Sequence, residues 1–343
     1  MKTIRDIDVK GKTILVRVDY NVPMENGEIS SDFRIRASLP TIEFLREQGA
    51  KKIVLISHLG RPEGREEGLS LRKVAERLNE MVSGVEFIDE NVGERIRGMK
   101  EGGIAVLENL RFDKREEENS EEFAREIVEA VKPDFYVQEG FGVLHRAHTS
   151  TVAIPKLVPT VAGFLVEKEI LGLDKIMNEP KKPVLLIIGG AKVGDKEPLI
   201  EKFKDKAEMI AVGGKIAADG YINEEVYVAE DFDEDMEGKR LDIGAVSTMK
   251  IAEMIDKAGT IIWNGVLGYV EDPAYTTSSA IVANLMGQKR NATTVVLGGD
   301  TTGFVEKEME KHSELEYTLV STGGGAALEY LLGKEMPGIK VIK

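Results

Sequence analysis

The sequence predicts an α/β protein made of two lobes, each a doubly wound parallel sheet covered by helices. Short apolar strands alternate with amphipathic helices along nearly the whole chain, which is the pattern of parallel sheets. The 343 residues are enough for two domains of ordinary size. One long helical stretch separates two such series of strands. We therefore expect two lobes joined by a helix, with a cleft between them.

The first lobe begins with an apolar strand and continues as strands and helices in alternation. Ile35, Leu39 and Ile42 recur at the spacing of one helical face, and Asn119 or Ser120 is placed to cap a later helix. The expected strands are 12–19, 53–57, 85–88, 104–107 and 135–137, and the further helices are 71–81 and 120–131.

A helical stretch from Val161 to Met177 links the lobes. The run Asn178-Glu-Pro-Lys-Lys-Pro183 ends it, because proline disfavours helix in itself and in the residue before it. We expect an N-terminal lobe at 1–160, a connecting helix at 161–180, a C-terminal lobe at 181–328 and a tail at 329–343.

The second lobe repeats the alternation, beginning with the unbroken apolar strand Val184–Ile188. A dense acidic run, Glu230–Asp235, lies in an irregular region, and we interpret it as a solvated loop rather than a metal site. The further expected strands are 209–212, 260–263, 294–297 and 317–320, and the helices are 196–206, 247–257, 276–286 and 301–311.

The composition excludes several classes of protein. A net charge of -14 argues against a general binder of nucleic acid or anionic membranes, although a local cationic pocket is compatible with it. The absence of cysteine excludes disulfides and thiolate catalysis. The first residues lack an apolar signal core, and no apolar run is long enough to span a bilayer. We expect a cytoplasmic monomer whose partners are small molecules.

Charged residues follow the strands of the first lobe at the points where the strands end. Ligands of doubly wound sheets bind at the carboxyl ends of the strands. Arginine suits phosphates and carboxylates because its planar fork donates two hydrogen bonds. A single arginine is compatible with a surface role and a single histidine with a core hydrogen bond, but their recurrence favours an anion site. The set is Asp19, Asn21, Arg34, His58, Arg61, Arg111, His145, Arg146 and His148.

The strand ends of the second lobe carry glycines and lysines instead. Gly189-Gly190 is followed by Lys192 and Lys196, in a pattern that is not a Walker A loop. Glycine lets backbone N–H groups approach a phosphate, and helix N-termini add partial positive charge. The alternative for this stretch is a strand, a tight turn and two solvated lysines. The further glycine groups are Gly213-Gly214, Gly298-Gly299 and Gly323-Gly324-Gly325.

Asp300 is the one carboxylate in this glycine-rich setting. It is a candidate Mg²⁺ ligand beside phosphates and equally a candidate N-cap for a helix over 301–311. One lobe therefore suits a small polyanion and the other a nucleotide, which indicates phosphoryl transfer across the cleft. A dehydrogenase is disfavoured because no Gly-x-Gly-x-x-Gly follows a strand.

A series of motifs, in the order of that family, makes the chain resemble phosphoglycerate kinase over nearly its whole length. They are Arg17-Val-Asp-Tyr-Asn-Val-Pro23, Arg34-Ile-Arg-Ala-Ser-Leu-Pro-Thr-Ile42, His58-Leu-Gly-Arg-Pro62, Glu108-Asn-Leu-Arg-Phe112, His145-Arg-Ala-His148, Gly189-Gly-Ala-Lys-Val-Gly-Asp-Lys196, Trp263-Asn-Gly265, Gly298-Gly-Asp-Thr301 and Ser321-Thr-Gly-Gly-Gly325. The resemblance implies two Rossmann-like lobes and a C-terminal tail that returns to the first lobe. It implies Mg²⁺-dependent transfer of the acyl phosphate of 1,3-bisphosphoglycerate to ADP, giving 3-phosphoglycerate and ATP.

The resemblance also implies roles for residues. The glycerate substrate would be held by Asp19, Asn21, Arg34, His58, Arg61, Arg111 and Arg146. The nucleotide and its metal would be held by Lys192, Lys196, Gly213, Gly214, Asn264, Glu271, Asp300 and Thr301, with Asp300 on the metal and Glu271 at the ribose hydroxyls. The nucleophile is a carboxylate that is ionised at pH 7, so no general base is required. Alignment and charge neutralisation would fall to Arg34, Lys196 and the backbone N–H groups near Gly299 and Gly324.

The second lobe departs from the family pattern. It is shorter, mainly between Gly214 and Leu241, and Lys215 stands where a third glycine is more usual. In the first lobe, Gln138-Glu-Gly-Phe141 replaces Asn-Asp-Ala-Phe. Two alternatives therefore stand beside an active phosphoglycerate kinase: a divergent kinase with a changed acyl-phosphate substrate or nucleotide, and a non-catalytic metabolite-binding relative. The intact lysines and Asp300 argue against the second.

Overall fold

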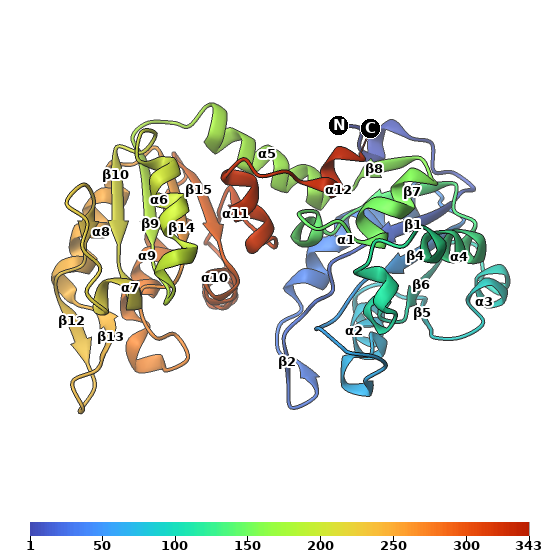
Figure 1. Cartoon of the computed structure of the whole chain (residues 1–343), viewed down its shortest axis with the longest axis horizontal. Helices are drawn as coiled ribbons and strands as arrows, with labels where there is room; N and C mark the ends of the chain where they lie inside the picture. Colours follow the sequence, from blue (N-terminus) through green and yellow to red (C-terminus); the bar gives the residue numbers. More distant parts are fainter. Residues whose placement is uncertain (343) are drawn as a thin grey trace. The chain divides into compact units, whose positions relative to one another are not determined.

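The computed structural model describes residues 1–342, and for Asp195 the backbone only. The chain forms two compact units, one of residues 1–168 with the final segment from Glu335, the other of Glu169–Lys334 (Figure 1). Each unit contains a six-stranded sheet whose neighbouring strands are all parallel. The prediction of two doubly wound α/β lobes is therefore confirmed. In the described part of the chain, no helix is long and apolar enough to cross a membrane.

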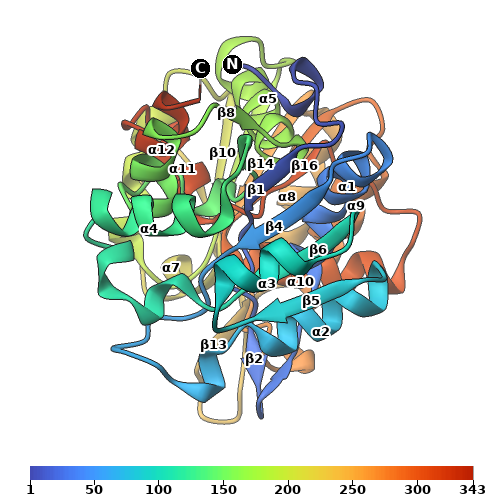
Figure 2. The ribbon, with the colours of Figure 1, turned by 90° about the vertical axis from the view of Figure 1, so that its right-hand side faces the viewer.

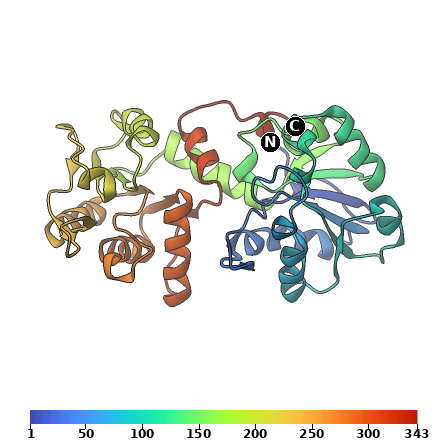
Figure 3. The same cartoon turned by 60° about the horizontal axis from the view of Figure 1, so that its bottom comes forward.

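The first unit is a sheet with helices on both faces (Figure 2). In sheet order, its strands are β5 (Val85–Ile88), β6 (Gly103–Leu107), β4 (Lys52–Ile56), β1 (Thr13–Arg17), β7 (Phe135–Gln138) and β8 (Thr160–Ala162). Its main helices are α1 (Phe33–Glu47), α2 (Arg72–Met81), α3 (Val92–Gly98), α4 (Glu121–Val131) and α12 (Pro337–Lys340), with a small hairpin of β2 (Met24–Glu25) and β3 (Glu28–Ile29). The N-terminal segment and α12 belong to the same unit and lie side by side (Figure 3).

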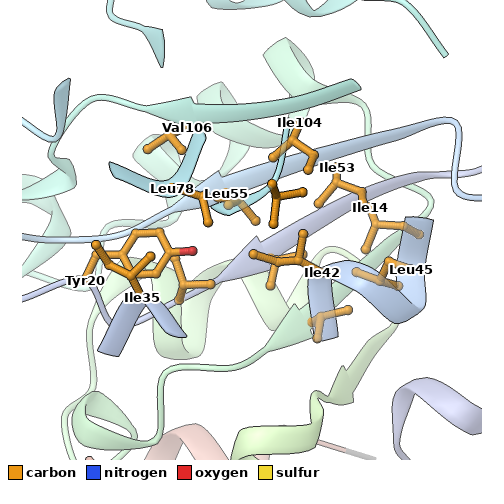
Figure 4. Packing of buried hydrophobic residues seen from close by; sticks show 14 of the residues in the cluster. Ile14, Tyr20, Ile35, Ile42, Leu45, Ile53, Leu55, Leu78, Ile104 and Val106 are labelled. Atoms are coloured by element: carbon orange, nitrogen blue, oxygen red, sulfur yellow. The ribbon is translucent and has the colours of Figure 1, made fainter. Parts of the chain in front are cut away.

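Strand β1 shows why this sheet is covered on both faces. Its residues alternate, with Ile14 and Val16 in one apolar cluster and Leu15 in the other. Helices α1 and α2 contribute to the first cluster, for example Ile42 and Leu78 (Figure 4). Helices α3 and α4 contribute to the second. The continuous apolar run of the sequence is thus the signature of a strand buried on both sides.

The second unit has the same construction. In sheet order, its strands are β11 (Tyr227–Val228), β10 (Met209–Val212), β9 (Val184–Ile188), β14 (Thr260–Asn264), β15 (Thr293–Leu297) and β16 (Leu319–Val320). Its main helices are α6 (Glu197–Phe203), α7 (Gly214–Ala218), α8 (Ala245–Lys257), α9 (Thr277–Gln288), α10 (Gly299–Lys311) and α11 (Gly325–Leu331), with a separate hairpin of β12 (Phe232–Glu234) and β13 (Arg240–Ile243).

In both sheets, the strand register aligns the carboxyl ends of neighbouring strands, from which the functional loops begin. In the first, Arg17 pairs with Ile56 of β4 and with Gln138 of β7. In the second, Asn264 pairs with Ile188 of β9 and with Leu297 of β15. The loops that follow these strands therefore emerge side by side at one edge of each sheet, where parallel sheets bind ligands.

Three sequence predictions need correction. Helix α5 (Phe164–Asn178) begins later than Val161, because Thr160–Ala162 pair with β7 as the edge strand β8. The acidic run is not a solvated loop, because Phe232–Glu234 pair antiparallel with β13. Helix α10 begins at Gly299 with Gly298 as its N-cap, so Asp300 lies inside the first turn and is not the cap.

Candidate active site

A buried ion pair lies just beyond the end of β1. Asp19 is 5% exposed, and its carboxylate pairs with Arg34 in the first turn of α1. Burial would raise the pKa of Asp19, but attraction to Arg34 and Arg17 outweighs burial and lowers the pKa to about 2. Asp19 is therefore ionised at neutral pH and holds the Arg34 guanidinium at the carboxyl end of the sheet.

His58 follows β4 and is buried beside the same pair. Its Nδ1 lies 3.2 Å from Arg17 Nη2 and 4.0 Å from Asp19 Oδ1. A guanidinium only donates, so Nδ1 is the acceptor and the ring proton is assigned to Nε2. Burial and the charge of Arg17 hold the pKa of His58 well below its usual value. His58 is thus a neutral hydrogen-bond donor at neutral pH, not a cation.

The backbone of one residue, Gly60, links the loops that follow β1, β4 and β6. The Gly60 N–H donates to Asn21 Oδ1 at 2.8 Å, and the Gly60 carbonyl accepts from Arg111 Nη1 at 2.6 Å. Arg111 is 6% exposed, burial lowers its pKa, and its Nε lies 3.0 Å from Glu117 Oε1. Its Nη2 is buried with no hydrogen-bond partner in the described chain. A buried, unused guanidinium donor indicates a place for an anion.

The remaining candidates of the first unit lie around this group. Arg61 is exposed and makes no hydrogen bond or ion pair with a described residue. Arg146 is half-buried in the loop after β7, and its Nε contacts His145 Nε2 at 3.1 Å. His148 is buried 3.9 Å from Glu116, and burial with the neighbouring arginines lowers its pKa to about 3. Direct contacts join Asp19 with Arg34 and with His58, and Gly60 links Asn21 with Arg111.

Arg17, Ser150 and Glu116 form a buried support beneath these residues that was not predicted from the sequence. Arg17 is 1% exposed and donates through Nη1 to Val18 O at 2.7 Å and through Nε to Ser150 Oγ at 3.3 Å. Ser150 in turn donates to fully buried Glu116 from N at 3.0 Å and from Oγ at 2.5 Å. The available signal was an arginine inside the apolar run of β1, since a buried charge in a strand requires partners.

A cavity of about 660 Å³ lies at the strand ends of the second unit, a volume typical of small-molecule sites. Three predicted nucleotide-binding residues, Gly214, Glu271 and Asp300, line it. The β12–β13 hairpin supplies another part of the lining, including Phe232 and Arg240. The acidic run that was predicted as a loop is therefore part of a hairpin that forms one wall of this cavity.

In the second unit, the backbones of the loops after β9 and β14 are in close contact. A Cβ at Gly189 would overlap the carbonyl oxygens of Gly265 and Val266. A Cβ at Gly213 would lie 2.8 Å from Leu267 Cδ2. These glycines therefore allow close packing of the loops, whereas Gly214 is itself part of the cavity lining.

The N-terminal end of α10 is open to approach. A Cβ at Gly299 would meet nothing within 4 Å, and a Cβ at Gly324 would lie 3.9 Å from Gly299 N. The two predicted catalytic backbone positions are thus neighbours. Unpaired N–H groups at the start of a helix attract negative charge.

Lys196 and Asn264 contact each other. Lys196 Nζ hydrogen-bonds to Asn264 Oδ1, and Asn264 is 1% exposed at the end of β14. Thr301 is also buried, and its Oγ1 accepts from Gly265 N at 2.8 Å, so its hydroxyl supports the loop after β14. Lys192 is exposed. The structure thus joins Lys196, Asn264 and Thr301 to one loop and leaves Lys192 in solvent.

Asp300 fits a metal ion that arrives with the nucleotide. It is exposed in the first turn of α10 and lines the cavity. Among residues 1–342, no group of three or more acidic or histidine side chains is arranged to hold a metal by itself. Mg²⁺ commonly takes one or two carboxylates and completes its coordination with substrate phosphates and water. A single carboxylate at a cavity of this kind is consistent with that chemistry.

The sequence matches the family model described as phosphoglycerate kinase over residues 4–235 and 219–334. The chain belongs to the phosphoglycerate kinase family. It is 38% identical to the phosphoglycerate kinase of Dictyoglomus turgidum, over 99% of the chain and 98% of that protein. It is 40% identical to that of Aquifex aeolicus, over 98% of the chain and 96% of that protein.

Solved phosphoglycerate kinase structures share the fold. The enzyme from Pyrococcus horikoshii aligns with a TM-score of 0.88 and 29% identity, over 100% of the chain and 98% of that structure. The enzyme from Coxiella burnetii aligns with a TM-score of 0.79 and 31% identity, over 99% and 98%. The two segments of the family match overlap at residues 219–235, a stretch that contains β11 and β12. The departure from the phosphoglycerate kinase pattern is therefore located beside the cavity wall.

Proposed function

We propose that the chain transfers a phosphoryl group reversibly between 1,3-bisphosphoglycerate and ADP, giving 3-phosphoglycerate and ATP. The observation that carries this proposal is the presence of two different anion sites in one chain of this family. One is the arginine cluster of the first unit, and the other is the Asp300 cavity of the second. We also propose a cytoplasmic monomer that acts on small molecules. The net charge of -14 disfavours nucleic-acid and anionic-membrane partners.

We assign the glycerate substrate to the lobe at residues 1–160. Arg34 and Arg111 would bind its charged groups, since Arg34 is oriented by Asp19 and Arg111 has an unused donor. His58 would donate from Nε2, and Asn21 from its amide nitrogen, because Oδ1 already accepts from Gly60. The further cationic contacts would come from Arg61 and Arg146.

We assign the nucleotide to residues 181–328, reached through the connecting helix at 161–180. The tail at 329–343 would return to the first lobe, whose final segment begins at Glu335. The phosphates would be bound by Lys192 and Lys196, and the ribose hydroxyls by Glu271. The supporting positions are Gly213, Gly214, Asn264 and Thr301. Asp300 would hold Mg²⁺, which neutralises negative charge on the phosphates when bound.

Catalysis on this proposal is alignment and charge neutralisation. The acceptor carboxylate is already ionised, so no residue needs to remove a proton. Arg34, Lys196 and the N–H groups near Gly299 and Gly324 would stabilise the charge of the transferring group. The substrate and nucleotide residues belong to different units, so the two half-sites must meet and exclude water during transfer.

A coupled assay tests the function. Purified protein is mixed with 3-phosphoglycerate and Mg-ATP, and a reductive coupling enzyme drains the product. We expect turnover of about 1–100 per second, as is usual for kinases, and none when 3-phosphoglycerate is omitted. Absence of turnover together with tight binding of 3-phosphoglycerate would replace the proposal with a non-catalytic metabolite-binding relative.

A changed nucleotide preference is a second candidate, favoured by one observation. The interrupted family match lies at the hairpin that lines the cavity, where Lys239 and Arg240 add cations to the wall. Cationic donors suit the O6 and N7 acceptors of guanine. Replacing ATP by GTP in the same assay decides this, and an ATP preference above about tenfold in kcat/KM would remove the candidate.

A further inference from the structure

Glu139 is a fully buried carboxyl group that the proposed reaction does not use. It follows β7 directly, and both of its oxygens lie 3.2 Å from the Leu165 N–H in the first turn of α5. The Val166 N–H also hydrogen-bonds to it. A Cβ at Gly163 would overlap Glu139 Oε2, so the backbone before α5 passes the carboxyl group where only glycine fits.

The first turn of α5 is held by two elements at once. Its unpaired N–H groups are taken by Glu139 after β7 and by Thr41 of α1, whose Oγ1 accepts from Phe164 N at 2.9 Å. Both partners are themselves buried. A helix start held by two side chains has its direction fixed relative to both elements.

The same two elements carry the substrate site. Helix α1 begins with Arg34, the partner of Asp19. The Glu139 backbone N–H donates to Arg17 O at 2.9 Å, and the Arg17 side chain contacts His58 at 3.2 Å. Glu139 therefore contacts Arg17 directly, and through Thr41 it contacts the helix that carries Arg34.

We propose that Glu139 is a positioning residue, which fixes the direction in which α5 leaves the substrate site. Helix α5 continues into the second unit at residue 169, so a change at its start reaches the unit that carries the proposed nucleotide-binding residues. The inference rests on the proposed function, because it matters only if a group passes between the two units. Loss of Glu139 leaves the substrate-binding and nucleotide-binding groups in place and disturbs their alignment.

The protonation state of Glu139 gives the inference a second signature. Burial raises its pKa to about 8, against the hydrogen bonds from Thr41, Leu165 and Val166. The ionisable groups that face it include Glu167 on α5 and Tyr20 after β1. The carboxyl group is protonated at neutral pH and becomes charged as the pH rises through about 8, which strengthens its hydrogen bonds from the N–H groups of α5.

Three variants test this: Glu139→Ala, Glu139→Gln and the control Glu167→Gln. Glu167 lies in the same turn of α5 but pairs with Arg5 on the surface. We expect Glu139→Ala to lower kcat by about 10- to 100-fold while both KM values stay within about threefold. Glu139→Gln keeps an acceptor oxygen and cannot ionise, so it should keep the wild-type kcat at pH 7 and lose the added protection of residues 164–168 from hydrogen exchange above pH 8. The control should match the wild type.

Other outcomes overturn the inference. These are an unchanged kcat in Glu139→Ala, a rise of KM in proportion to the fall of kcat, or a Glu139→Gln protein as slow as Glu139→Ala at pH 7. If Glu139→Ala does not fold, the pH profile of hydrogen exchange in Glu139→Gln still decides. Amide hydrogen exchange at residues 164–168 is measured in parallel and should accelerate in Glu139→Ala. An inactive wild type would refute the proposed function, whereas unchanged exchange would refute the anchor alone.

Discussion

In both units the candidate anion site lies at the carboxyl ends of the strands of a parallel sheet, but the two sites are made of different chemical groups. The first unit uses charged side chains that already have partners, namely buried Arg17 and Arg111 and half-buried Arg34. The second uses bare backbone, with Gly189, Gly265 and the open N-terminal end of α10. Side chains define charge and direction, which suits a small polyanion. Backbone and glycine define shape, which suits a larger nucleotide.

This difference determines which substitutions disrupt each site. In the first unit, removal of one partner leaves another charge buried without compensation. In the second, addition of a single methyl group displaces a loop. Substitutions that exploit these two weaknesses therefore test the comparison directly.

The largest effect is expected from Gly189→Ala. The added Cβ would push apart the loops after β9 and β14, whose backbones are joined by Gly189 N to Asn264 O at 3.0 Å and by Gly190 N to Val266 O at 2.8 Å. Overpacking against backbone should lower the free energy of unfolding of this unit by about 3 kcal/mol and abolish measurable ATP binding. Urea denaturation and calorimetry measure the two quantities.

Gly303→Ala is the matched control, because it makes the same change inside α10, where a Cβ meets nothing within 4 Å. It should be neutral or stabilise by up to about 1 kcal/mol. Wild-type ATP affinity in Gly189→Ala would show that the contact of the two loops is dispensable.

The next effect is expected from Lys196→Ala. Lys196 is the cation held beside the strand ends by Asn264, so its loss should lower kcat by about 10²- to 10³-fold. The KM for ATP should change less than about fivefold, because charge on the transferring group is greatest in the transition state. Steady-state kinetics with Lys257→Ala, an exposed lysine of α8, as control decides this. Near-normal turnover of Lys196→Ala would contradict the proposed role of Lys196 in stabilising the transition state.

The smallest effect is expected in acid, from Arg34→Ala. The pKa of Asp19 is about 2 in the folded protein and 3.8 ordinarily, so the ionised carboxylate stabilises the folded state above pH 4. This contribution, about 2 kcal/mol, is lost as the pH falls from about 4 to about 2. The free energy of unfolding should therefore differ between wild type and Arg34→Ala at pH 7 and converge near pH 2.

Urea denaturation at several pH values measures this convergence, with Arg125→Ala, which breaks a surface pair with Glu121, as control. A difference between wild type and Arg34→Ala that stays constant from pH 7 to pH 2 would mean that Asp19 does not depend on Arg34.

The fold and the strand-end residues were predictable because parallel strands leave a strong signal. Apolar runs such as Val184–Ile188 mark the strands, and their register then brings residues such as Asp19 and His58 to one edge. The hairpin at β12 was not predictable, since acidic, weakly apolar residues give no clear period of two. The role of Arg17 depends on Ser150 and Glu116, which lie far away in sequence.

The backbone of Gly60 has a consequence for the residue that follows it. Both of its polar atoms are held, the N–H by Asn21 and the carbonyl by Arg111, so the backbone at this point is a fixed pivot. Arg61 is attached to that pivot, and its side chain is exposed. The side chain can change rotamer in solvent while the backbone at its Cα stays in place. Binding of a phosphate by Arg61 therefore requires only this side chain to become ordered. No loop has to rearrange.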